Sequence, residues 1–267
     1  MPSSIDFSNP MTTAGDLIIG GTSGAPGRLA AGASGYVLTS NGSGAAPSWQ
    51  AGGGGGGGFG NGEASFTAPV LGSFTQDNFG GSTSATTVTL GGISAIQFTD
   101  PGLSGNTNCL RSLLQAIPTP ANPWTVTARI RTNSLIVHFV QFGLVLKDST
   151  SGKYISYGWC GDTGPLGLVE WTNANSFSGD SVVNAVGTPP FSMDMTDAWF
   201  QWQYDGTHLN YNYSRDGNYF VTLQQTSPTA LLPNLPDYAG IGMNVNSAGS
   251  ILQTCNMECF SFTLTQP

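Results

Sequence analysis

Residues 198–225 read AWFQWQYDGTHLNYNYSRDGNYFVTLQQ, and this stretch decides the fold class. Apolar and polar side chains alternate on both sides of Asp205-Gly206, a dipeptide typical of a two-residue hairpin turn. Because strand side chains point alternately to opposite faces, the apolar set shares one face, which we expect to lie against a core. A two-residue turn would pair Phe200 with Tyr211, Trp202 with Leu209 and Tyr204 with Thr207.

The second turn of the stretch is Asp216-Gly217. A five-residue loop there would set Tyr213 against Tyr219 and Tyr211 against Val221, which keeps the aromatic rings inside. The opposite face of the hairpin then carries polar side chains, with one tryptophan at its end. We call it the predicted polar face, and its members are Trp199, Gln201, Gln203, His208, Asn210 and Asn212.

The chain after residue 63 follows the same strand-and-turn pattern. Trp124–Arg131 alternates strictly and predicts a half-buried strand, whereas Leu135–Leu146 is apolar at both parities, as in a central strand. Cys109–Ala116 fits one or two helical turns or a strand. The sequence therefore predicts an all-β fold. Further short strands are expected at residues 65–67, 74–76, 86–90, 94–100, 153–160, 166–171, 238–245 and 259–264.

Composition argues against several classes of function. Only 8% of the 267 residues are charged, and the formal net charge is −8 with 7 Lys+Arg. With so few basic side chains to neutralise phosphates, we expect no nucleic-acid partner, and without a long apolar run we expect no membrane insertion. The first residues, MPSS, lack the basic and apolar regions of a signal peptide. The cysteines could make two disulfides or none, and no zinc site is expected from their spacing: Cys109, Cys160, Cys255 and Cys259.

Seven consecutive glycines, Gly52–Gly58, predict a flexible tether, because glycine retains the most backbone freedom. We therefore divide the chain into an attachment and oligomerisation segment (1–50), a glycine-rich linker (51–62) and a globular domain (63–267). The short strands expected in residues 1–50 cannot bury a core alone. That segment needs a partner surface, either copies of itself or a larger assembly.

Five motifs in residues 1–50 carry a resemblance: Pro10–Ile18, Gly20-Gly21, Arg28–Gly32, Gly35–Gly42 and Ala46–Trp49. Their order and spacing resemble a segment that recurs in tail-fibre and other virion proteins of tailed bacteriophages. The resemblance implies a virion component, usually a homotrimer, that contacts other virion proteins through residues 1–50. It also implies assembly in the host cytoplasm, which explains why no signal peptide is needed.

A second resemblance covers most of residues 63–267. It implies a two-sheet antiparallel jelly-roll sandwich of the concanavalin A-like lectin/glucanase kind. Proteins with this fold bind sugars, cleave glycans or act as inert spacers, so the resemblance leaves function open. The motifs that resemble this family are Trp124–Arg131, Phe142–Lys147, Tyr154–Gly158, Trp199–Gly206, Tyr213–Gly217 and Ala239–Gly242.

Catalytic residues are not expected. Glycanases of this fold carry a Glu-x-Asp-x-x-Glu strand or a similar one, and a retaining pair needs carboxyl groups about 5 Å apart. Glu63, Glu170 and Glu258 have no acidic residue within four positions, and the spacing of Asp194 and Asp197 places them on opposite strand faces. The glycine run lacks the Lys-Ser/Thr ending of a phosphate loop. We expect no cofactor, and a calcium site on turn aspartates stays an open alternative.

Binding is then the favoured activity. Sugars need amide or carboxylate partners for their hydroxyl groups and an aromatic plane, and the predicted polar face offers both. We predict that it is the ligand-binding site; the alternative is a solvated outer face. The predicted function is a bacteriophage tail fibre or spike that presents its jelly roll to a host-surface glycan. A decoration protein without receptor activity and a glycan depolymerase are the alternatives.

Overall fold

The computed structural model describes residues 9–21, 25–34, 36–51, 64–80, 83–101, 108–132, 138–161, 164–182, 197–245 and 254–267. The chain divides into two compact units, Met1–Gly55 and Gly56–Pro267, and each is considered by itself. The predicted tether, Gly52–Gly58, lies outside the described residues, as do Glu63 and Asp194.

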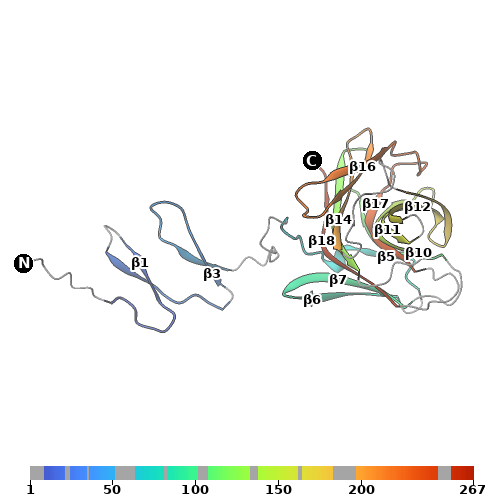
Figure 1. Ribbon diagram of the computed structural model, residues 1–267. Helices are drawn as coiled ribbons and strands as arrows, with labels where there is room; N and C mark the ends of the chain where they lie inside the picture. Colours follow the sequence, from blue (N-terminus) through green and yellow to red (C-terminus); the bar gives the residue numbers. More distant parts are fainter. Residues whose placement is uncertain are drawn as a thin grey trace, which may run out of the picture. The chain divides into compact units, whose positions relative to one another are not determined.

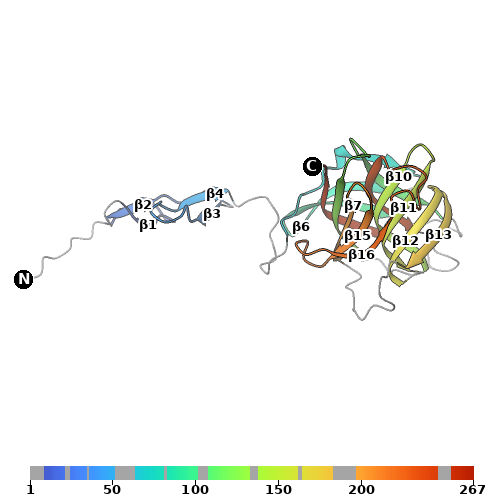
Figure 2. The same ribbon diagram turned by 90° about the horizontal axis from the view of Figure 1, so that it is seen from above.

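The first unit consists of two β-hairpins (Figure 2). In the first hairpin β1 (Leu17–Gly20) pairs with β2 (Pro26–Leu29), and in the second β3 (Tyr36–Thr39) pairs with β4 (Ser48–Ala51). Asp16 is the one buried residue among the described residues of this unit. Within that described part, the unit therefore lacks a hydrophobic core. Its exposed apolar side chains, between 39% and 53% accessible, are Met11, Ile18, Tyr36, Val37 and Leu38.

A buried carboxylate holds the first unit together in place of a core. Asp16 accepts hydrogen bonds from the backbone N–H of Thr13 at 2.8 Å and from Arg28 Nε at 2.7 Å. The Arg28 guanidinium holds the pKa of the Asp16 carboxyl well below its usual range. Trp49 Nε1 donates to the carbonyl of Ala30 at 2.7 Å, which links the second hairpin to the chain that follows β2.

Two seven-stranded antiparallel sheets form the second unit (Figure 1). This confirms the predicted all-β, two-sheet sandwich and shows that the Cys109–Ala116 segment is a strand. No helix in the described part of the chain has the length and hydropathy to cross a bilayer. Sheet I has the order β13 (Ser176–Val182), β12 (Gly164–Asn173), β11 (Lys153–Gly161), β10 (His138–Asp148), β17 (Tyr238–Val245), β8 (Leu110–Ala116), β5 (Thr75–Asp77). Sheet II has the order β16 (Val221–Thr226), β15 (Leu209–Ser214), β14 (Asp197–Tyr204), β9 (Trp124–Thr132), β18 (Cys255–Thr265), β7 (Ile93–Asp100), β6 (Ser84–Leu90).

Aromatic rings dominate the core between the two sheets. Tyr157 of sheet I lies edge-on to Phe200 at 5.5 Å and to Tyr211 at 5.7 Å, both on sheet II. Trp159 lies edge-on to Phe200 at 4.8 Å. Each such pair adds about 0.5–1.5 kcal/mol beyond the burial of its area. The apolar face that the sequence alternation predicted around Phe200 and Tyr211 is therefore the face that lies against the core.

The hairpin of β14 and β15 keeps the predicted faces but not the predicted register. Trp202 pairs with Tyr211 rather than with Leu209, so the predicted two-residue turn is wrong and the connection runs from Asp205 to His208. Asp205 Oδ1 accepts two backbone N–H groups of this connection, at 2.8 and 2.6 Å, which stabilises the longer turn. Because the register moves by two residues, the paired side chains of the two strands remain on their predicted faces, whereas Thr207 and His208 lie in the connection.

The second turn departs further from the prediction. Tyr213 pairs with Val221 rather than with Tyr219, and a bulge follows Tyr211. Tyr219 and Val221 are 82% and 62% exposed, so the prediction that they lie inside is wrong. The reason is that Val221 begins β16, an edge strand of sheet II whose side chains receive less cover, and that Tyr219 lies in the connection ahead of this strand.

Sheet I curls so strongly that its own strands close its outer side (Figure 1). The backbone N–H of Leu110, at the start of β8, donates to the carbonyl of Ala174 in the β12–β13 turn at 2.8 Å. A Cβ on Gly158 would lie 2.1 Å from the carbonyl oxygen of Phe142, so only glycine permits this close strand approach. The curl encloses a second buried cluster: Leu110, Leu114, Val145, Tyr154, Cys160, Val169, Trp171 and Ala174.

The four cysteines, all of them described, are buried and form no disulfide. This agrees with one of the two alternatives left open by the sequence. Burial raises the pKa of the Cys259 thiol to about 12, so this side chain stays protonated and unreactive in the folded protein.

Candidate functional site

The outer face of sheet II brings together five of the six residues of the predicted polar face. His208 is the exception, because it lies in the connection ahead of β15. The face is built from rows that run across the strands, one residue from each strand. From β9 through β14 to β15 the rows are Thr125–Gln203–Asn210, Thr127–Gln201–Asn212 and Arg129–Trp199–Ser214.

The amides in these rows mainly bind one another. Asn212 Nδ2 donates to Gln201 Oε1 at 2.8 Å, and Gln201 Nε2 donates to Thr127 Oγ1 at 3.0 Å. Gln225 of β16 donates to Asn210 Oδ1 at 2.7 Å. Asn210 and Asn212 are buried as a result. These cross-strand bonds stabilise the sheet, and they leave few of the amide groups available to a ligand.

Trp199 is covered by an earlier part of the chain. Its ring is 3% exposed and stacks on Phe66 at 5.8 Å. The covering segment is held by a hydrogen bond from the backbone N–H of Ala64 to the carbonyl of Asp216, 2.7 Å long. Residues 65–67 are not a strand, so that expectation is wrong: they cross the face as irregular chain. Trp199 is placed on the predicted face, but it offers no open ring.

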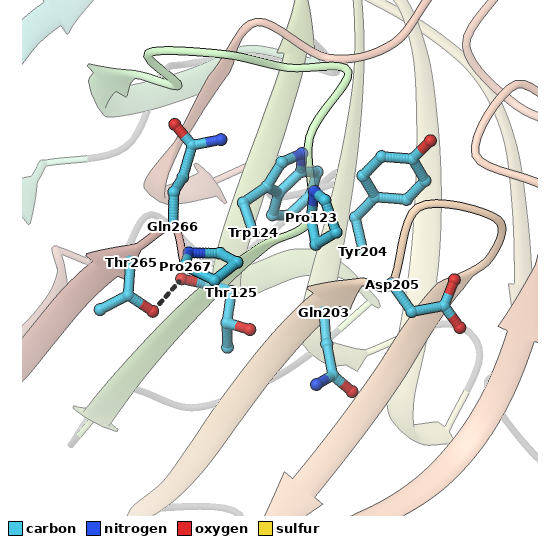
Figure 3. A pocket seen from close by; sticks show the side chains of 9 residues that line it. All are labelled: Pro123, Trp124, Thr125, Gln203, Tyr204, Asp205, Thr265, Gln266 and Pro267. Carbon is cyan, nitrogen blue, oxygen red and sulfur yellow. Dashed lines mark hydrogen bonds between the residues drawn. The ribbon is translucent and has the colours of Figure 1, made fainter.

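A hollow of about 360 Å³ opens at the Gln203 end of this face (Figure 3). It lies where the start of β9, the end of β14 and the chain at the end of β18 meet. Its volume is within the usual range of small-ligand sites, about 300–1,000 Å³. The lining residues are Pro123, Trp124, Thr125, Gln203, Tyr204, Asp205, Thr265, Gln266 and Pro267.

Gln203, Asp205 and Thr265 are the exposed polar side chains of the hollow, and the Thr265 hydroxyl donates to the carbonyl of Thr125 at 3.5 Å. Gln203 is exposed, and its amide makes no hydrogen bond to the described residues. The Asp205 side chain is 41% exposed, with Oδ2 3.6 Å from His208 Nδ1. Hydrogen bonds from the backbone N–H groups of His208 and Thr207 hold the pKa of the Asp205 carboxyl below its usual value. The hollow therefore presents an ionised carboxylate and an amide at neutral pH.

Aromatic and proline rings form the apolar wall of the hollow. Trp124 and Tyr204 lie with their ring centres 5.9 Å apart, and the Tyr204 hydroxyl donates to the carbonyl of Gly206 at 2.9 Å. Figure 3 shows Pro123 beside these two rings. Trp124 Nε1 is buried and makes no hydrogen bond to any residue that the structure describes. Because both aromatic rings are buried, they shape the hollow without presenting a broad stacking surface.

Sequence reasoning placed one residue of the hollow, Gln203, at the site and missed the others. The strands β9 and β14 pair Trp124 with Tyr204, a contact across some eighty residues that no local pattern reveals. Asp205 was recognised as a turn former but not as a ligand group. Its position beside Gln203, at the end of a polar strand face, was the available signal.

Most other carboxylates in the described part of the chain are engaged by protein groups. Asp148 and Asp216 accept backbone N–H groups of their own turns. These oxygens therefore face donors rather than a cation, and the described residues contain no group of three His, Cys, Asp or Glu that could hold a metal ion. Within the described part of the second unit, lysine and arginine form the ion pairs Lys147–Asp77, Arg111–Asp100, Arg129–Asp197 and Arg131–Glu258.

No family model and no curated protein matches this sequence. Among solved structures, the chain is similar to a functionally unknown Saccharomyces cerevisiae protein, with 11% identity, a TM-score of 0.48 and coverage of 74% of this chain and 98% of that one. The exoplasmic/lumenal domain of VIP36, bound to Ca²⁺ and Man3GlcNAc, matches with 10% identity and a TM-score of 0.41, covering 74% of this chain and 85% of that domain. The GH43 protein BlXynB of Bacillus licheniformis matches with 11% identity and a TM-score of 0.44, covering 65% of this chain and 33% of that protein.

These likenesses concern the fold and carry no conclusion about activity. The class of fold is a two-sheet antiparallel β-sandwich, as the order of the strands in its two sheets shows. What the sandwich does has to be argued from its own residues.

Proposed function

We propose that this chain is a structural component of a tailed-bacteriophage virion, a tail fibre or spike, whose sandwich binds a host-surface glycan without cleaving it. The observation that supports binding is the outer face of sheet II, where rows of amide and hydroxyl side chains end at an open hollow. Amide and carboxylate oxygens suit sugar hydroxyl groups, and a concave site with a few polar groups on an apolar wall suits a small ligand.

The first unit supports the virion part of the proposal. Tyr36, Val37 and Leu38 are consecutive exposed residues of one short strand, so each face of its hairpin shows apolar surface. A two-stranded hairpin of this kind is marginal in water on its own. Contact with further copies, or with other virion proteins, would cover it. The resemblance of residues 10–49 to tail-fibre segments favours three copies, assembled in the host cytoplasm.

The state of the carboxylates supports binding over hydrolysis. Cleavage of a glycosidic bond needs two carboxyl groups on either side of it, one of them able to give up a proton. In the described part of sheet II, Asp197 and Glu258 are held in ion pairs by Arg129 and Arg131. Among the side chains that line the hollow, Asp205 has the one carboxylate.

The test uses the full chain and polysaccharides extracted from the surfaces of a panel of bacteria. Retention of the protein on at least one immobilised polysaccharide, with the chain length of that polysaccharide unchanged after incubation, supports the proposal. Shortening of the polysaccharide would establish a depolymerase. Failure to bind any polysaccharide, together with binding to phage heads or tails, would establish a decoration protein. The native mass measured on the same preparation reports whether the chain is a trimer.

A further inference from the structure

We propose that the hollow lined by Gln203 and Asp205 is the sugar-contacting subsite, and that it takes a neutral sugar with two neighbouring hydroxyl groups. This inference rests on the proposed glycan binding and makes it specific. It places the contact at the end of sheet II, not over the rows of amides that the sequence singled out.

In the described part of the sandwich, the outer side of sheet I and the rows of amides on sheet II are already occupied by protein groups. The outer side of sheet I is closed by the bond between Leu110 and Ala174, and side chains such as Trp171 fill it. Trp171 Nε1 donates to Ser156 Oγ at 3.0 Å, so even its polar atom is engaged inside the curl. On sheet II the amides of Gln201 and its row bind one another. A ligand there would have to break bonds that it could at best replace.

The hollow has the polar groups that a pair of hydroxyls requires. The amide of Gln203 offers a donor and an acceptor, and neither is used by the described residues. Asp205 offers an acceptor that stays ionised, since its turn bonds lower its pKa. Its position is fixed before any ligand arrives, because Oδ1 accepts the N–H groups of Thr207 and His208. A preorganised acceptor loses little entropy on binding.

The charge of the hollow selects against acidic sugars. Asp205 is its one charged side chain, and no lysine or arginine is among the nine lining residues. A uronate or sialate would bring a second negative charge close to Asp205, with no lysine or arginine among the lining residues to offset it. A neutral sugar instead places its hydroxyls on Asp205 and Gln203, while its C–H face lies along the exposed ring of Pro123.

The experiment measures binding of D-glucose, D-galactose, D-mannose, N-acetylglucosamine and D-glucuronate to the full chain by ligand-observed NMR. The variants are Asp205→Asn and Gln203→Ala. The asparagine keeps an oxygen for the turn and replaces the other oxygen by an amide group. The matched control is Asp216→Asn, because Asp216 makes the same kind of turn at the far end of β15 and does not line the hollow. Thermal unfolding confirms that all three variants fold.

We expect at least one neutral sugar to bind, and both hollow variants to weaken it about tenfold or more, as for loss of a hydrogen bond to a charged or buried group. Asp216→Asn should leave affinity within about twofold. Binding that survives both hollow variants would overturn the subsite while leaving glycan binding intact. Preference for D-glucuronate over every neutral sugar would also overturn it. Absence of binding to every sugar, in a protein that is retained on polysaccharide, would overturn the hollow but not the proposed function.

Discussion

Replacing Phe66 by alanine tests whether an earlier segment of the chain covers the outer face of sheet II. The Phe66 ring is 7% exposed, stacks on Trp199 at 5.8 Å and lies 4.7 Å from the Arg129 guanidinium carbon. Deleting a buried phenylalanine ring costs about 3–5 kcal/mol. Because irregular chain around residue 66 can partly collapse into the space, we expect the lower end, about 3 kcal/mol. For a domain of this size that lowers Tm by about 6–12 °C.

The assay is urea unfolding followed by tryptophan fluorescence, combined with acrylamide quenching of the native state. Phe66→Ala should lower the unfolding midpoint with an unchanged m-value, and it should make Trp199 accessible to the quencher. Tyr219→Ala is the control, because that ring is 82% exposed and its loss should change stability by no more than about 0.5 kcal/mol. If Phe66→Ala costs as little as Tyr219→Ala, the covering role of the segment is refuted.

Three further predictions concern the curl of sheet I, the first unit and the thiols. Gly158→Ala should unfold the sandwich or lower its free energy of unfolding by about 3 kcal/mol or more and its Tm by more than 10 °C, because the added Cβ would meet a neighbouring carbonyl. Gly179→Ala, where the added Cβ meets nothing, should have a Tm near that of the wild type. Calorimetry of both variants measures the difference. Arg28 lowers the pKa of Asp16 in the folded state, so the ionised Asp16 carboxylate stabilises the first unit fully above the unfolded-state pKa of about 4, and this stabilisation is lost as the pH falls below that value. The acid sensitivity of the first unit, followed by Trp49 fluorescence, should disappear in Asp16→Asn. Iodoacetamide at pH 8 should label Cys259 only after denaturation, because burial raises the pKa of its thiol to about 12. Mass spectrometry that finds Cys259 alkylated in the native protein would contradict this prediction.

Local patterns predicted those features of the fold that local chemistry controls. Alternation on both sides of Asp205 placed Trp202 inside and Gln203 outside, and the structure agrees on both. The predicted pairing of β14 with β15 was wrong by two residues, because the Asp205 carboxylate accepts two backbone N–H groups and stabilises a longer turn. That error did not change the faces, since side chains repeat every two residues along a strand.

Long-range contacts decided the parts that the sequence did not predict. Trp199 was expected at an open end of the face, but Phe66, more than a hundred residues earlier, covers it. The hollow exists because β9 and β14 are neighbours and because Gln266 and Pro267, which follow β18, lie beside them (Figure 3). Neither contact can be predicted from the alternation of polar and apolar residues within a single strand. The curl of sheet I did have a local sign, the glycine at position 158, but its meaning depends on which strand lies next to it.

The most direct test of the account follows the indole N–H resonances of the six tryptophans in ¹⁵N-labelled protein while a bound neutral sugar is titrated to saturation. Trp124, at the wall of the hollow and with no hydrogen bond from Nε1 to the described residues, should shift, and Trp171, enclosed in the curl of sheet I, should not. A shift of Trp171 with an unmoved Trp124 would place the sugar on the other sheet and contradict the account.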